Sequence, residues 1–284
     1  MRRVAPSSLT PEALAGLDAH YNEPVSHRDE IIELFRTAAT DREHGAGEIE
    51  KTLIRGLLDV EARLRLESLH KGLKMLAEGQ PAMANLRAMA GWMAAVESPA
   101  SCVSRLARRA AVLEELPDRL AANARPLLED VQTVVTISRS SAVAAVVEGA
   151  WERGWSGSVV VFDGTASGRG ADQAQRLATS GHAISRPDVA APKWLETASV
   201  VVIVGADAVG RRRFVNSAGT RVLLELARHR GVKRVLVADS GKDVEEELVE
   251  EIVARSPRHS ESADREWPIF EAVALDLVTT RVKE

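Results

Sequence analysis

Hydrophobic positions recur at helical spacing through the first part of the chain. Ile31, Ile32, Leu34 and Phe35 form one stripe, which predicts a helix from His27 to about Thr40. A second stripe runs from Ile49 to Leu73 at helical spacing over about seven turns, with alternating charges on its other face that are typical of solvated surface. The polar, glycine-bearing stretch 41–47 separates the two stripes.

Two more helices follow a break at Gly79-Gln80-Pro81, where Pro81 suits the first position of a helix. The first carries side chains that are typical of a core, namely Met83, Leu86, Met89, Trp92 and Met93. The second is expected from Ser101 to Ala124, with a break near Pro117. Residues 1 to about 26 contain proline and serine and are expected to lie over the surface. Because no strand is predicted before Pro126, we expect residues 1–125 to form an all-helical domain.

The pattern changes after residue 126. Four β-branched runs predict strands at Val131–Ile137, Ser158–Phe162, Val200–Val204 and Val232–Ala238. The helices expected between and after them are Ser141–Arg153, Gly170–Ser180, Thr220–His229 and Lys242–Ala254. This alternation predicts a doubly wound parallel sheet, so we expect residues 126–284 to form an α/β domain. The polar stretch from Ser256 to Glu266 is expected to be a surface loop before a last apolar segment, Ile269–Val278.

Composition narrows the class of protein. The 284 residues include 37 basic and 41 acidic ones, a net charge of −4, so we expect no bulk attraction to nucleic acid or to an anionic membrane. The single cysteine, Cys102, excludes an internal disulfide and fits a reducing compartment. No signal peptide and no apolar run of about 20 residues is recognisable. We therefore expect a soluble, cytoplasmic protein.

The stretch from Val200 to Thr220 concentrates the most promising chemistry. An apolar strand ends at Gly205, and Asp207 lies just beyond its carboxyl end, where open α/β sheets bind ligands. A basic turn at 211–213 and the start of a helix at 216–220 follow. A carboxylate, cations and a helix N-terminus together can hold a phosphorylated ligand and offer it a proton acceptor. The alternative is that Asp207 only caps a turn or a helix.

A second junction, Thr136–Ser141, combines hydroxyl groups with Arg139 at the expected start of a helix. Backbone N–H groups and the guanidinium make a phosphate-binding turn plausible there. A simple serine N-cap explains the same residues equally well.

A third junction, Asp163–Gly170, is rich in glycine, but Gln173 stands where a dinucleotide-binding fingerprint needs its third glycine. A turn that brings Arg169 near a ligand is the better interpretation. The spacing of the seven histidines predicts no metal site, and we expect no cofactor.

Read together, these motifs resemble one superfamily. It comprises the α, β and δ subunits of eukaryotic translation initiation factor 2B, methylthioribose-1-phosphate isomerase and ribose-1,5-bisphosphate isomerase. The segments that carry the resemblance, with the family pattern in brackets, are His44-Gly45-Ala46-Gly47 (RGAG), Gln80–Leu86 (RPTAVNL), Thr136–Val143 (THCHSSAV), Asp163–Gly170 (ESRP…G), Gly205-Ala206-Asp207 (GAD), Asn216–Thr220 (NKxGT), Pro268–Glu271 (PxFD/E) and Leu275–Thr279 (LVT). The wider DREHGA segment at 41–46 resembles the archaeal initiation-factor-like members.

The resemblance implies a helical N-terminal domain, a Rossmann-like C-terminal domain, a phosphosugar site in the cleft between them, and dimers or larger oligomers. The isomerases use a cysteine and an aspartate to move a proton or hydride, and these positions are Ser138 and Asp207 here. The ligand-binding positions carried over are His44, Gly45, Ala46, Gln80, Arg139, Ser140, Thr165, Arg169, Asn216, Ser217, Gly219 and Thr220.

Several departures from the family pattern remove charge. His44, Gln80 and Thr165 stand where the family has arginines, and Ser217 stands where it has a lysine. Each lost charged hydrogen bond is worth about 1.5–3 kcal/mol, so the affinity for a bisphosphate should fall. Arg139, Arg169 and Arg211 are candidate replacements. Ser138 has a pKa far above that of a thiol and is a poor substitute for the acid or base.

Two functions follow from this pattern. The first is a non-catalytic, initiation-factor-2B-like regulatory protein that binds a sugar phosphate or nucleoside monophosphate, forms a homodimer or higher oligomer, and has a translation factor as a candidate partner. The second is an aldose–ketose phosphosugar isomerase with Asp207 as the acid/base and Ser138 as a hydrogen-bond donor. A cysteine restored at position 138 should alter turnover only in the second case.

Overall fold

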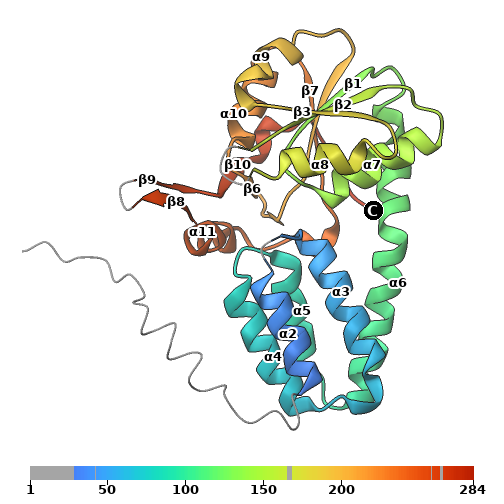
Figure 1. Cartoon of the computed structure of the whole chain (residues 1–284), viewed down its shortest axis with the longest axis vertical. Coiled ribbons are helices and arrows are strands. Elements are labelled where there is room, and N and C mark those ends of the chain that lie inside the picture. The colour runs from blue at the N-terminus through green and yellow to red at the C-terminus, as the bar shows by residue number, and fades with distance from the viewer. Residues whose placement is uncertain (1–28, 42, 165–167, 257, 263–264) are drawn as a thin grey trace, which may run out of the picture.

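The computed structural model describes residues 29–41, 43–164, 168–256, 258–262 and 265–284 (Figure 1). The expectation for residues 1–26 and the candidate ligand residue Thr165 lie outside the described residues. No helix in the described ranges is both long and apolar enough to cross a membrane.

The first part of the described chain is helical, as the apolar stripes predict. Its helices are α2 (Glu30–Thr40), α3 (Ala46–Asp59), α4 (Leu66–Gly79), α5 (Ala84–Ala94) and α6 (Pro99–Ala124), with a short 3₁₀ turn η1 at Glu61–Arg63. Local signals set their starts: Asp29 caps α2 by accepting from the Ile31 N–H at 3.1 Å, and Ser98 caps α6 ahead of Pro99. Figure 1 shows α6 running from this helical half up alongside the rest of the molecule.

The core of the helical half is filled by fully buried Phe35, Leu57, Leu76, Met89 and Leu106. Helices α2 and α4 approach most closely where Gly72 faces Phe35. A Cβ built on Gly72 would lie 2.0 Å from the Phe35 ring, so only glycine fits there.

The remainder is built on a six-stranded parallel sheet of order β11-β7-β4-β1-β2-β3. Its strands are β1 (Thr133–Ile137), β2 (Ser158–Phe162), β3 (His182–Arg186), β4 (Val200–Val204), β7 (Lys233–Val237) and β11 (Thr280–Val282). This order doubles back between β1 and β4, the arrangement of a doubly wound Rossmann-like fold. The predicted fold class, helices followed by an α/β sheet, is confirmed.

Helices cover both faces of the sheet. One core contains residues of α6, α7 (Ser141–Glu152) and α8 (Gly170–Leu177), and the other contains residues of α9 (Ala191–Trp194) and α10 (Thr220–His229). Four short 3₁₀ turns lie nearby, η2 (Arg125–Leu127), η3 (Asp188–Ala190), η4 (Ser240–Lys242) and η5 (Leu275–Leu277).

A small antiparallel sheet and a hairpin complete the molecule. The sheet has the order β10-β6-β5, with β5 at Ala208–Val209, β6 at Arg213–Ser217 and β10 at Phe270–Ala274. It packs with α11 (Glu246–Arg255). The hairpin pairs β8 (Arg258–Ser262) with β9 (Arg265–Pro268) and projects from the body in Figure 1.

The structure corrects several predicted elements. The stripe from Ile49 to Leu73 is divided between α3 and α4, because the chain folds back so that α4 can pack on α2. Helix α6 is unbroken at Pro117, which lies on the exposed side, where a carbonyl that loses its helical partner can bond to water. The expected loop 256–266 contains the β8–β9 hairpin, and the basic turn at 211–213 leads into β6 rather than directly into a helix.

Candidate functional site

The strands β1 and β4 lie side by side, and the chain leaves them in opposite directions at their carboxyl ends. Ser138 follows β1 and Asp207 follows β4, so the two positions that the resemblance singles out both lie beyond the carboxyl ends of the strands that flank this switch point. Ser138 has a φ of 60°, a left-handed conformation that is uncommon for residues other than glycine. Its N–H donates to the Phe162 carbonyl at 2.9 Å, which fixes this turn against β2.

Ser217, at the end of β6, reaches the same point. Its hydroxyl bonds to the Ser138 hydroxyl at 3.0 Å, and both side chains are buried. Beside it, the Asn216 amide donates to the Thr220 hydroxyl at 3.0 Å, which donates to the Ser217 carbonyl at 2.7 Å. The junction that follows β1 (136–141) and the segment 216–220 therefore form one hydrogen-bonded cluster.

Gly219 allows that cluster to join α10. Its φ is 100°, and a Cβ there would lie 3.0 Å from the Ile137 side chain. A larger residue would strain the backbone and press on β1.

Asp207 lies between the sheet and the helical half. Its N–H donates to the Val215 carbonyl at 2.8 Å, and its own carbonyl accepts from the Ala84 N–H at 3.3 Å. Burial raises the pKa of the Asp207 carboxyl above its usual value, and the charges of Lys242 and Arg169 offset part of that rise. A carboxyl group in such surroundings is suited to proton transfer.

Lys242 is a buried cation that sequence reasoning missed. Its ammonium group donates to the carbonyl of Ala206, next to Asp207. The sequence presents it only as the expected first residue of a helix, whereas it ends the 3₁₀ turn η4 after β7. A signal existed, since the carboxyl end of β7 lies at the same edge of the sheet as those of β1 and β4.

Residues from β11 onward hold the turn that carries Lys242. Arg281 and Lys283 both pair with Asp243, and the Lys283 ammonium lies 2.6 Å from that carboxylate. The Ser240 N–H donates to the Glu284 carboxylate at 2.9 Å. Side chains of the edge strand β11 and of the residues that follow it therefore hold this turn at two points, Ser240 and Asp243.

The N-terminus of α10, which the sequence suggests for phosphate, already holds a carboxylate. Glu271 of β10 accepts from the Arg221 N–H at 2.9 Å. Burial raises the pKa of Glu271, and the N–H groups of Arg221, Gly219 and Thr220 partly offset it. An anionic ligand at the N-terminus of α10 would have to compete with the Glu271 carboxylate.

At the junction 136–141, Ser140 is the N-cap of α7 and accepts from the Val143 N–H at 3.3 Å. The capping interpretation therefore describes this side chain. Arg139 donates to the Glu43 carbonyl at 3.0 Å and to the Glu48 carboxylate at 2.6 Å. Its guanidinium thus joins the sheet half to the helical half.

The residues of the helical half that match the family motifs also take part in contacts within the protein. The His44 ring lies 2.8 Å from the Asp41 carboxylate, and Gly45 is the N-cap of α3. The Ala46 carbonyl accepts from Asn85 at 3.0 Å. Buried Gln80 donates to the Ala38 carbonyl at 3.0 Å and to the Asp41 carbonyl at 2.6 Å, so it holds the C-terminal end of α2.

At the glycine-rich junction that follows β2, Arg169 is the N-cap of α8 and lies close enough to Asp207 to influence its pKa. A Cβ on Gly170 would lie 2.1 Å from the Phe162 carbonyl oxygen, so this glycine permits close packing of strand and helix. Gln173, which breaks the dinucleotide fingerprint, is buried and donates to the Ser140 carbonyl at 3.1 Å.

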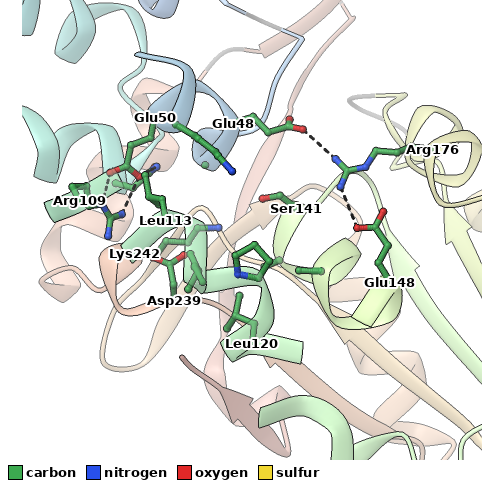
Figure 2. Close-up of a pocket in the computed structure, with 17 residues that line it drawn as sticks. Glu48, Glu50, Arg109, Leu113, Leu120, Ser141, Glu148, Arg176, Asp239 and Lys242 are labelled. Carbon is green, nitrogen blue, oxygen red and sulfur yellow. Dashed lines mark hydrogen bonds and ion pairs between the residues drawn. The ribbon is translucent and has the colours of Figure 1, made fainter. Parts of the chain in front are cut away.

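A cleft of about 210 Å³ separates the two halves (Figure 2). Its polar wall includes Glu50, which is 1% exposed and paired with Arg109 at 2.7 Å. Lys242 and Asp239 line it from the sheet half, and Leu113 and Leu120 of α6 supply an apolar wall. Among the described residues, none of the ligand residues expected from the sequence lines this cleft, although Gly47 and Ser141, which are sequence neighbours of Ala46 and Ser140, do.

Comparison with known proteins gives a consistent result. The model of the initiation factor 2 subunit family matches residues 33–266. No curated protein matches the sequence.

Solved structures resemble this fold over most of its length. The translation initiation factor eIF-2B of Pyrococcus horikoshii OT3 has a TM-score of 0.77 at 20% identity, covering 90% of this chain and 95% of that one. The tetrameric eIF2B-beta2-delta2 complex from C. thermophilum has a TM-score of 0.71 at 15% identity, covering 90% and 91%. The 5-methylthioribose 1-phosphate isomerase of P. horikoshii OT3 has a TM-score of 0.67 at 15% identity, covering 89% and 82%. Initiation factor 2B proteins and an isomerase thus share this architecture.

Proposed function

This chain belongs to the initiation factor 2 subunit family, and from that membership we propose that it is a non-catalytic, initiation-factor-2B-like regulatory protein of the cytoplasm. It binds a sugar phosphate or nucleoside monophosphate at the edge of its sheet and assembles into a homodimer or larger oligomer through its α/β part. A translation factor is its proposed protein partner.

The hydrogen bond between Ser138 and Ser217 is the observation that carries this proposal. The resemblance expects a reactive cysteine and a lysine at these two positions. The Ser217 hydroxyl donates to the Ser138 hydroxyl in a buried site, and two neutral hydroxyl groups provide neither a thiolate nor a cation. The pair supports structure and ligand contact rather than proton or hydride transfer.

The groups expected to bind phosphate already have partners within the protein, which also supports a non-catalytic regulatory role. Arg139 is bound to Glu48, and Glu271 fills the α10 N-terminus. A bisphosphate would have to displace these contacts, whereas a monophosphate needs fewer cations. A ligand with one phosphate group is therefore the better fit to the charges available.

The isomerase remains a second candidate because of Asp207. Its raised pKa, with Lys242 and Arg169 nearby, is the property that a general acid or base requires. In that case Asp207 would transfer the proton while Ser138 donates a hydrogen bond to the substrate oxygen.

A thermal-shift screen against ribose 1,5-bisphosphate, methylthioribose 1-phosphate and AMP tests binding first. A ligand at 100 times its Kd adds about 2.7 kcal/mol of stability, which moves the Tm by several degrees. Asp207→Ala should reduce the shift, whereas Asp276→Asn, at an exposed aspartate, should not. No shift with any of the three compounds would count against a ligand-binding role.

Turnover assays on the ligands that bind separate the two candidates. The regulatory protein should give no product, and Ser138→Cys should leave it inactive. Product that disappears in Asp207→Asn would support the isomerase instead. Sedimentation equilibrium of the purified chain tests assembly, and a monomer at micromolar concentration would contradict the proposed oligomer.

A further inference from the structure

The cleft of about 210 Å³ between the two halves is distinct from the strand-end site, because none of the described residues expected to bind a phosphorylated ligand lines it. Sites for larger organic ligands commonly measure about 300–1,000 Å³. The cleft therefore suits a compact occupant. Figure 2 shows Glu50, Arg109 and Lys242 on one side of the cleft and Arg176 with Glu148 on the other.

The charges that line the cleft balance, since four of its titratable side chains are acidic and four are basic. The carboxylates have partners within the protein. Glu50 pairs with Arg109 at 2.7 Å, and Arg176 pairs with Glu48 at 3.1 Å. Because the lining is neutral as a whole, an occupant whose own charges sum to zero is favoured.

Two ammonium groups in the lining lack a carboxylate partner. Within the described part of the chain, neither Lys51 of α3 nor Lys242 of η4 forms an ion pair. Lys242 is 8% exposed, and its ammonium group, with three N–H donors, donates to the Ala206 carbonyl, while the Asp207 charge acts on it from a longer range. A buried cation is costly unless an anion pairs with it. The two lysines therefore favour a carboxylate in the cleft.

A buried hydrogen-bond acceptor also lines the cleft. The Oδ1 atom of Asn85 is buried and accepts no hydrogen bond from the described residues. Reversing the amide would not remove this deficit, because Nδ2 donates to the Ala46 carbonyl at 3.0 Å and to the Glu50 carboxylate at 2.8 Å. A buried acceptor without a donor is unfavourable. The amide oxygen therefore favours an occupant that carries an N–H donor.

Helix α6 contributes a second acceptor and an apolar wall. Pro117 has no N–H, so the Leu113 carbonyl loses the donor that a helix normally provides four residues further on. Both residues line the cleft. Leu113 and Leu120 of α6, with Ala145 of α7, supply apolar surface beside these polar groups.

We propose that this cleft binds a small α-amino acid with an apolar side chain, in its zwitterionic form. The carboxylate of the amino acid accepts from Lys51 and Lys242. Its ammonium group donates to the Asn85 Oδ1 atom and to the Leu113 carbonyl, and its side chain packs against α6 and Ala145. A zwitterion leaves the charge of the lining balanced, whereas a phosphate group would have no apolar part and would add net charge. This second site is independent of the proposed function at the strand ends.

Isothermal titration calorimetry with three matched probes tests the chemistry of the site. L-leucine should bind, whereas 4-methylpentanoate, which lacks the ammonium group, and 3-methylbutylamine, which lacks the carboxylate, should each bind at least about tenfold more weakly. No binding of L-leucine would mean that the cleft holds only water and would overturn the proposal. Equal affinity for all three probes would also overturn it, because apolar contact alone would then explain binding.

Substitutions at the lining locate the bound amino acid. Lys51→Met removes a half-buried ammonium group but keeps an apolar stem, and it should weaken L-leucine binding at least about tenfold. Lys74→Met, at an exposed lysine of α4 outside the cleft, should leave the affinity unchanged. Ala145→Leu fills the cleft and should abolish binding, with melting curves to check that each variant is folded. Wild-type affinity in folded Lys51→Met would place the amino acid elsewhere and overturn the proposal.

Discussion

At the scale of single residues, the contact between Ser138 and Ser217 determines what the site can do. The sequence identified both positions and predicted the loss of the thiol and the ammonium group. It could not show that the Ser217 hydroxyl donates to the Ser138 hydroxyl, because that depends on β6 ending beside β1. Removal of one member of such a buried pair lowers the free energy of unfolding, because the other member loses a hydrogen bond.

A double-mutant cycle measures that interdependence. Ser138→Ala or Ser217→Ala alone should each cost about 1–3 kcal/mol in the free energy of unfolding, because each removes the buried hydrogen bond between the two side chains. The double variant should cost less than the sum of the two. Chemical denaturation measures all four proteins, and strictly additive costs would mean that the hydroxyl groups do not interact.

Asp207 gives a prediction about pH. Its folded-state pKa lies above the ordinary value of 3.8, so the folded protein binds more protons than the unfolded one between those two pKa values. The contribution of Asp207 to stability is therefore fully present below pH 3.8 and is lost as pH rises through the raised pKa. Asp207→Asn should accordingly be more stable than wild type at pH 7, and the difference should shrink as pH falls toward 3.8. Melting curves across this range measure it, and a variant less stable at pH 7 would contradict the assignment.

At the scale of helices and strands, fully buried apolar runs were the reliable signal. β1, β2, β4 and β7 are short β-branched segments with buried interiors, and the sequence predicts each of them. The edge strand β3 was missed because His182–Arg186 contains only two apolar residues, Ala183 and Ile184, and is half exposed. β6 was missed because one of its pairing partners, β10, lies more than fifty residues further along the chain, and β5 is a two-residue strand that pairs only with β6.

The same limit applies to the candidate site. The strand-end residues Ser138 and Asp207 could be located from the rule that ligands bind at carboxyl ends of parallel strands. Gln80 forms a hydrogen bond with α2, and Glu271 forms one with α10. Both bonds join residues that are far apart in the sequence, so no local pattern predicts them.

Two glycines on helices should respond oppositely to alanine. Gly72→Ala in α4 forces a methyl group into the Phe35 ring and should cost about 1–3 kcal/mol. Gly91→Ala in α5 meets nothing within 4 Å and should stabilise the protein by about 0.5–1 kcal/mol through helix propensity. Thermal or urea unfolding distinguishes the two, and a loss of stability in both would point to a different packing of α5.

At the scale of the whole molecule, a small number of polar contacts join the two halves. Glu48 of α3 accepts from Arg139 at 2.6 Å and from Arg176 of α8 at 3.1 Å. Figure 2 shows Arg176 between Glu48 and Glu148 at one end of the cleft. The long helix α6 contributes buried residues to both cores. The cleft is therefore bordered by ion pairs on one side and by a continuous helix on another.

Glu48→Gln tests the importance of this contact. The variant should lose about 1–3 kcal/mol of unfolding free energy, because two charge-assisted hydrogen bonds weaken at once. Glu225→Gln breaks an exposed pair with Arg221 on α10 and should cost less than about 0.5 kcal/mol. Urea unfolding compares them, and equal small effects would show that the contact between the halves adds little.

The clamp around η4 also has a consequence for synthesis. Arg281, Lys283 and Glu284 leave the ribosome after every other strand of the sheet, yet they fix the turn that presents Lys242 to Asp207. The helical half and most of the sheet can fold while translation continues, but this corner forms only after residues 281–284 have emerged. A nascent chain that stops before residue 280 would carry a nearly complete sheet with an unfinished site.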